Sequence, residues 1–130
     1  MNKVERRSSR DADWQRVKAE VRERDDNKCR LIRCLTMAEY LILKKNAGRL
    51  LNIIDPAHYL SVSSRPDLCY DADNICCVNR YSHENLDDFK SPIDGHPIDK
   101  DEVDNWWMRI LSTNYKQLNS LRNKGLLKEN

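Results

Sequence analysis

Two short apolar runs constrain the fold of this chain more than any other feature. LLNII, residues 50–54, and NICCV, residues 74–78, are rich in residues that favour buried strands. The segment between them is rich in turn-forming residues, and the sequence SHENLDDF that follows begins with Ser82, which can cap a helix. We therefore expect a strand, a loop, a second strand and a helix, in that order, within residues 50–90.

Helical patterns flank this unit at residues 10–24, 36–47 and 99–124, where apolar side chains recur at helical spacing. The three segments also carry capping signals, namely Asp11 or Asp13 for the first, Thr36 with Glu39 and then Gly48 for the second, and Asp99 with Glu102 and then Gly125 for the third. Helices around two strands predict an α+β fold. Trp106 and Trp107 are expected to face the core from the last helix.

The composition fits a single domain, residues 1–130, because 39% of the residues are hydrophobic and can fill a modest core. The formal net charge is only +2, but residues 66–104 carry eleven acidic and three basic residues, whereas the segments on both sides are net basic. Basic flanks could hold phosphates while the acidic segment gathers carboxylates around a cation. Solvated faces and an acidic loop would produce the same pattern.

No segment has the pattern of a secretion signal or of a membrane span. We therefore expect an intracellular, cytoplasmic protein without a membrane partner. The five cysteines, an odd number, are expected as reduced thiols or metal ligands rather than as disulfides.

Three short motifs carry the chemistry. His58 lies in AHYL at the end of the first expected strand, Asn74 in DNICCV at the start of the second, and His83 in SHENLD at the start of the helix. In this order they resemble the HNH endonucleases, whose ββα-metal core of two strands and a helix holds one divalent cation. The preceding sequence DWQRVKAEVRERDDNKCRL resembles the helix and cysteine-bearing turn found before that core in phage and mobile-element members, so the resemblance covers roughly residues 12–90.

The resemblance implies a treble-clef-like ββα-metal core at residues 50–90 that hydrolyses DNA phosphodiester bonds. His58 matches the general base that removes a proton from the attacking water. Asn74 matches the residue that fixes the strands and the base, and in some members binds the metal. His83 matches the metal ligand at the helix start, and Asp87, one turn later, matches a second helical ligand of some members. The implied cofactor is one divalent cation, Mg²⁺ or Mn²⁺, and the implied partner is DNA.

Elementary chemistry is consistent with these roles. A neutral imidazole suits the generation of a nucleophile near neutral pH, and a divalent ion with open positions suits relief of the charge that builds on the phosphate. Arg65 and Arg80, which lie near these motifs in sequence, are candidates to clamp the phosphate, because a guanidinium group can bind phosphate oxygens bidentately.

One departure from the family pattern concerns the metal. Members usually place an Asp, Glu or His ligand immediately before the base, and this chain has Ala57 there. On a regular strand Asp55 would face the same side as Ala57, about 7 Å further back. Pro56 is expected to disturb regular pairing, which could let Asp55 turn inward as a ligand. A D-x-x-H order also resembles the start of another branch of the ββα-metal nucleases.

A second departure concerns zinc. Many relatives brace the core with a zinc ion held by two C-x-x-C pairs. Here four residues separate Cys29 from Cys34, and the second pair is reduced to the adjacent residues Cys76 and Cys77, which point to opposite faces of a strand. A residual structural zinc site that includes these cysteines, or Cys69, stands against ordinary buried thiols.

Two other functions stay open. One is a DNA-binding module that keeps the fold but has lost catalysis, for which Ala57 is the main evidence. The other is a structural or protein-partner role through the tryptophan-bearing helix, which would leave an exposed apolar stripe on the monomer. The sequence does not distinguish a monomer from a dimer.

Overall fold

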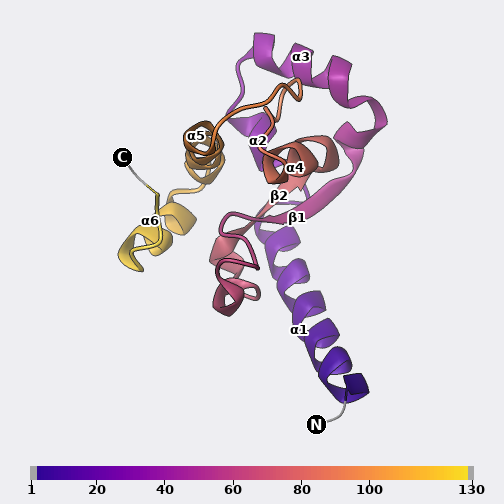
Figure 1. Cartoon of the computed structure of the whole chain (residues 1–130), viewed down its shortest axis with the longest axis vertical. Coiled ribbons are helices and arrows are strands. Elements are labelled where there is room, and N and C mark those ends of the chain that lie inside the picture. Colours follow the sequence, from indigo (N-terminus) through magenta and orange to yellow (C-terminus); the bar gives the residue numbers. More distant parts are fainter. Residues whose placement is uncertain (1–2, 129–130) are drawn as a thin grey trace.

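The two expected strands pair with each other in the computed structural model, which describes residues 3–128 and the side chains of residues 12–128. Strand β1, Ile54–His58, and strand β2, Ile75–Asn79, form an antiparallel sheet in which His58 lies opposite Ile75. Helix α4, Arg80–Asp87, follows β2 directly. Many more residues lie in helices than in this small sheet (Figure 1), and the chain has the expected mixed α+β character.

Strand β1 begins later than predicted. Residues Gly48–Asn52 form a 3-10 turn, so most of the LLNII run is not in the strand. The expectation that Pro56 disturbs the pairing was wrong, since Pro56 lies in register opposite Cys77. Arg80 N–H donates to the Ile53 carbonyl, and Tyr59 N–H donates to the Asn74 carbonyl. These bonds show that the odd-numbered residues of β1 direct their backbone N–H and C=O groups towards β2. The nitrogen of Pro56 therefore points away from the partner strand, where no N–H is needed.

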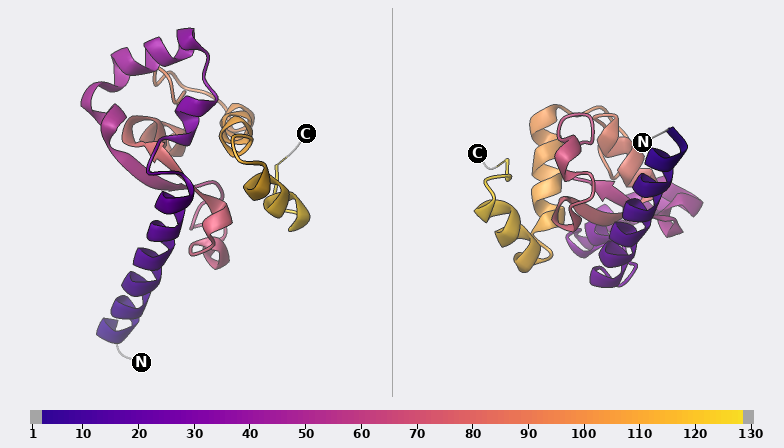
Figure 2. Two further views of the ribbon diagram at one scale, coloured as in Figure 1. Left: turned by 180° about the vertical axis from the view of Figure 1, so that it is seen from behind. Right: turned by 90° about the horizontal axis from the view of Figure 1, so that it is seen from below.

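The N-terminal half contains three helices. Helix α1 spans Lys3–Arg24 and so begins well before the predicted caps; it extends away from the rest of the molecule (Figures 1 and 2). A tight turn, with Asp26 and Asn27 at positive φ, leads into the short helix α2, Arg30–Arg33. Helix α3, Met37–Ala47, has the predicted Thr36–Glu39 capping box and ends at Gly48, which has φ 54°.

Two later predictions needed correction. Helix α4 is capped by Asn79 rather than Ser82, whose N–H donates to the Asn79 side-chain oxygen from inside the first turn. The predicted helix at 99–124 is two helices, α5 at Lys100–Leu111 and α6 at Tyr115–Asn123. The helix is interrupted at residues 112–114, Ser-Thr-Asn. The hydroxyl groups of Ser112 and Thr113 donate to backbone carbonyls, and the side chain of Asn114 caps α6.

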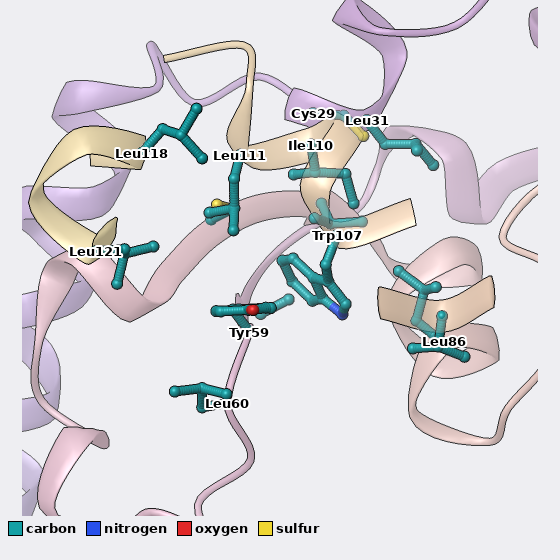
Figure 3. Packing of buried hydrophobic residues seen from close by; sticks show 14 of the residues in the cluster. Cys29, Leu31, Tyr59, Leu60, Leu86, Trp107, Ile110, Leu111, Leu118 and Leu121 are labelled. Atoms are coloured by element: carbon teal, nitrogen blue, oxygen red, sulfur yellow. The ribbon is translucent and has the colours of Figure 1, made fainter. Parts of the chain in front are cut away.

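The sheet separates two apolar clusters. The larger one lies between the sheet and helices α2 to α6, and Figure 3 shows Trp107, Ile110 and Leu111 of α5 projecting into it near Tyr59. The smaller cluster joins Val17 and Val21 of α1 to Ile75 and Cys77 of β2. Within the part of the chain that the structure describes, no helix is both long and apolar enough to cross a membrane.

A buried ionic cluster connects the N-terminal turn to the rest of the molecule. The Arg30 guanidinium donates to the Asp25 carboxylate at 3.1 Å, to the Gln117 side chain at 2.6 Å and to Thr113 Oγ1 at 2.6 Å. Asp25 also accepts from Arg24 and from the Cys77 backbone N–H. This cluster ties α1, α2, β2 and the C-terminal helices together.

Candidate active site around His58 and His83

His58 is the last residue of β1, and its ring is held on two sides. The indole of Trp14 stacks on it, with ring centroids 5.4 Å apart and an interplanar angle of 17°. Its Nε2 lies 3.0 Å from the Cys69 carbonyl oxygen. Because a carbonyl only accepts hydrogen bonds, Nε2 carries the proton. A neutral His58 therefore has its unprotonated lone pair on Nδ1.

Asn74 holds the loop that supplies this carbonyl. The side chain is fully buried; its Oδ1 accepts from Leu60 N–H at 2.8 Å, and its Nδ2 donates to the carbonyls of Leu60 and Leu68. Leu68 immediately precedes Cys69, so Asn74 fixes both ends of the loop against which His58 rests. Its side-chain oxygen is buried and accepts one hydrogen bond, so the observed contacts of Asn74 are structural.

His83 stands in the first half of α4 between two carboxylates. Its Nδ1 is 3.2 Å from Asp55 Oδ2 on β1, and its Nε2 is 3.3 Å from Asp87 Oδ2, one helical turn later. The hydrogen bond with Asp87 and, after it, the one with Asp55 raise the pKa of His83 against the opposing effect of burial. The two carboxylates thus approach opposite nitrogens of one ring.

Asp55 is shared between His83 and an arginine. Arg80 donates to both carboxylate oxygens, at 3.2 and 3.1 Å. Burial acts to raise the pKa of Asp55, but the hydrogen bonds from Arg80 and His83 outweigh it and keep that pKa below its usual value. Ala57, on the same side of the strand, is fully buried in the larger apolar cluster.

A cavity of about 740 Å³ lies beside these groups and brings His58 and Asp87 to one space. Its lining includes Tyr59, Leu86 and Trp107, which also belong to the larger apolar cluster that Figure 3 shows from close by. Arg65 also lines it, but this guanidinium is paired bidentately with Asp67. Arg80 is not among the lining residues and is held by Asp55.

Four cysteines are divided between the two apolar clusters. Cys29, Cys34 and Cys76 belong to or pack against the larger cluster and Cys77 belongs to the smaller one, so that Cys76 and Cys77 lie on opposite faces of β2 as predicted. The Cys29 sulfur accepts from the backbone N–H of Asn79, whereas the Cys34 thiol donates to the Leu31 carbonyl. Burial raises the pKa of Cys34 to about 11 and that of Cys77 to about 12. This arrangement gives no support to a zinc site that uses Cys76 and Cys77 together.

Two features of the site were not predicted from the sequence. Trp14 was expected on the apolar stripe of the first helix with Val17 and Val21, and that stripe was the signal that its ring faces the sheet. The carbonyl of Cys69 carries no sequence signal, since any residue could supply it.

Among residues 12–128, no group of three or more His, Cys, Asp or Glu side chains has the geometry of a metal site.

Comparisons with known proteins found no matching family model, no similar curated protein and no solved structure that matches this chain.

Proposed function

We propose that this protein is a metal-dependent endonuclease of the HNH type, built on a ββα-metal core, that hydrolyses DNA phosphodiester bonds. The observation that carries the proposal is the orientation of the His58 ring. Its Nε2–H is committed to the Cys69 carbonyl, so the basic nitrogen is Nδ1, and the residue lines a cavity that Asp87 also reaches. An oriented imidazole with a defined tautomer is what a general base requires.

In this proposal Nδ1 of His58 takes a proton from the water that attacks the phosphorus atom. The Cys69 carbonyl then stabilises the imidazolium that forms, because it accepts from the opposite ring nitrogen. Trp14 limits rotation of the ring. Asn74 acts by positioning the loop of Cys69, and we assign it no metal contact because its side chain is fully buried and does not line the cavity.

His83 and Asp87 fit two neighbouring ligands of a divalent cation. They would hold such an ion through the Nε2 atom of His83, once it has lost its proton, and through a carboxylate oxygen of Asp87. His83 Nε2 and Asp87 Oδ2 are 3.3 Å apart, and Asp87 reaches the cavity. Such a cation, Mg²⁺ or Mn²⁺, would supply charge neutralisation at the phosphate.

Asp55 is better suited to orient His83 than to bind the same cation. It contacts Nδ1, on the far side of the ring from Asp87. A carboxylate that accepts from the second nitrogen of a ligating histidine fixes its tautomer and orientation. For contact with phosphate, Arg65 is the stronger of the two predicted arginines because it lines the cavity.

The test is conversion of supercoiled plasmid to open-circle and linear forms by wild-type protein and by His58→Ala, with Mg²⁺, Mn²⁺ or excess EDTA. We expect cleavage that needs metal and falls by about 10²- to 10⁴-fold in the variant, the usual contribution of a general base. Unchanged thermal unfolding of the variant is the control for folding. Full activity of His58→Ala would refute the assigned base.

A binding module without catalysis is the second candidate, and Ala57 favours it. The usual ligand beside the base is replaced by a methyl group buried in the core. Salt-sensitive DNA binding without cleavage in any metal would support this candidate. The protein-partner alternative has less support, because Val103, Trp107, Ile110 and Leu111 of α5 are buried within the molecule.

A further inference from the structure

We propose that the cavity beside His58 receives an unpaired nucleobase of the substrate, which stacks on Phe89, while Lys100 contacts a nearby phosphate. The inference rests on the proposed function and specifies its substrate class: a single-stranded or locally unpaired nucleic acid. It draws on three independent observations, which concern the phenylalanine, the cavity and the cations.

Phe89 is the only phenylalanine of the chain, and packing in the core does not explain its position. It follows α4, lines the cavity and is 52% exposed. Its φ of 58° lies in the left-handed region, which is unfavourable for a residue with a bulky side chain. Its N–H donates to the Leu86 carbonyl, and its carbonyl accepts from Ile98 N–H. Together with the bond from Lys90 N–H to the Asn85 carbonyl, the bond to the Leu86 carbonyl ends α4 in a Schellman motif, whose left-handed position is usually a glycine. An exposed aromatic ring therefore occupies this position at the cavity although its side chain makes the backbone conformation less favourable, a pattern associated with ligand contact.

The cavity suits a flat, partly polar ligand. Its volume of about 740 Å³ is in the range of small-molecule sites. Its lining combines the apolar groups of Tyr59, Leu86 and Trp107 with the hydroxyl-bearing residues Ser61, Ser63 and Ser64. A nucleobase has two apolar faces and a polar edge, and so matches a lining of both kinds. A base can enter only when it is unstacked and unpaired, which favours single strands over duplex.

The cations supply a place for phosphate. Arg65, Lys100 and Lys128 line the cavity together with two carboxylates, Asp87 and Asp104. Arg65 is paired with Asp67, and Lys128 lies 3.5 Å from Asp104. Lys100, at the first position of α5, forms no ion pair within the described part of the chain. It is therefore the lining cation that can bind a phosphate without first leaving a carboxylate.

The experiment is fluorescence anisotropy with a labelled mixed-sequence oligonucleotide, either single-stranded or annealed to its complement. EDTA is present, so that metal-dependent cleavage cannot consume the probe. The proteins compared are wild type, Phe89→Ala, Phe89→Trp and Tyr115→Ala. Tyr115 is the matched control, since it is an exposed aromatic residue on α6, 73% accessible, that does not line the cavity. Thermal unfolding of each variant shows whether it is folded.

We expect Phe89→Ala to weaken single-strand binding by about 5- to 150-fold, the effect of losing one base-stacking contact, with duplex binding changed less than about twofold. Phe89→Trp should retain single-strand binding, and Tyr115→Ala should change neither. Equal loss on both oligonucleotides, or no loss on the single strand, would overturn the inference.

The same variants separate this inference from the proposed function. Binding of single strands that depends on Phe89, without cleavage in any metal, would support the nucleobase site and refute the nuclease. Cleavage that depends on His58, with Phe89→Ala indistinguishable from wild type on every substrate, would support the nuclease and refute the nucleobase site.

Discussion

Two aspartate–arginine clusters lie on this small sheet, and they differ in how far water reaches them. In the interior cluster the side chains of Asp25 and Arg30 are 1% and 0% exposed. In the candidate site Asp55 is 17% exposed and its partner Arg80 is 44% exposed. Both aspartates accept two or more hydrogen bonds, and both have a lowered pKa although burial opposes it.

The difference indicates which cluster can take part in chemistry. Arg30 donates to Asp25, Gln117, Thr113 and the Ile110 carbonyl, so no donor direction remains for a substrate. At Asp55 and His83 the partners are half-exposed and can be exchanged for water or a ligand. Saturated buried charges therefore fix the fold here, and partly hydrated ones are available for function.

The largest expected effect is on stability, from Asp25→Ala. This change leaves Arg30 as a buried charge without its counterion and removes the acceptor of the Cys77 N–H. We expect a loss of about 3–5 kcal/mol in the free energy of unfolding, measured by urea denaturation. Arg16→Ala is the control, because it breaks an exposed pair with Asp13 and should change stability by less than about 1 kcal/mol. Similar small effects of both changes would remove the contrast between the two clusters.

A smaller effect, on metal use rather than stability, is expected from Asp55→Asn. The change keeps the size of the side chain but weakens its hold on His83 Nδ1. We expect the Mn²⁺ or Mg²⁺ concentration for half-maximal cleavage to rise about 10-fold or more, as is usual when a carboxylate behind a ligand is lost. Asp67→Asn is the matched control, since it also loses an arginine pair but does not contact His83. An unchanged metal requirement would count against the orienting role.

The smallest expected effect concerns Glu39, which joins α3 to α5. Arg109 donates to both oxygens of Glu39. This hydrogen bonding is the main reason why the pKa of Glu39 falls to about 2. Because the folded pKa lies below the unfolded value near 4.5, the stabilisation is complete above pH 4.5 and is lost as the pH falls towards 2. The pair is partly exposed, so we expect about 1 kcal/mol or less.

The measurement for Glu39 is the unfolding temperature of wild type and Glu39→Gln between pH 7 and pH 2. Glutamine preserves the capping box with Thr36, so the comparison isolates the ion pair. The difference between the two proteins should shrink below pH 4.5. Glu102→Gln, an exposed change without an ion pair in the described residues, is the matched control for the loss of one carboxylate. A constant difference across the range would contradict the assignment.

Local signals were predictable where one short segment decides the outcome. The capping box of Thr36 and Glu39 forms as expected, and Asp99 caps α5. The break between α5 and α6 was missed although Ser112, Thr113 and Asn114 signal it locally, because the apolar period on both sides suggested one continuous helix. The regular pairing of β1 at Pro56 was missed. A strand accepts a proline when the proline nitrogen points away from the partner strand, and the sequence does not show which side of β1 faces β2.

The sequence by itself determined the order of strand, strand and helix and the place of His58 at the end of the first strand, since periodicity and turn residues are local properties. The predicted places of the other two residues were wrong: Asn74 ends a 3-10 turn directly before β2, and His83 lies inside α4, which begins at Arg80. Only the tertiary structure decided which ring nitrogen of His58 bears the proton, that Asp55 and Asp87 approach opposite sides of His83, and that Phe89 and Lys100 line the cavity of His58. These relations join residues that are distant along the chain, and they depend on packing that no local pattern encodes.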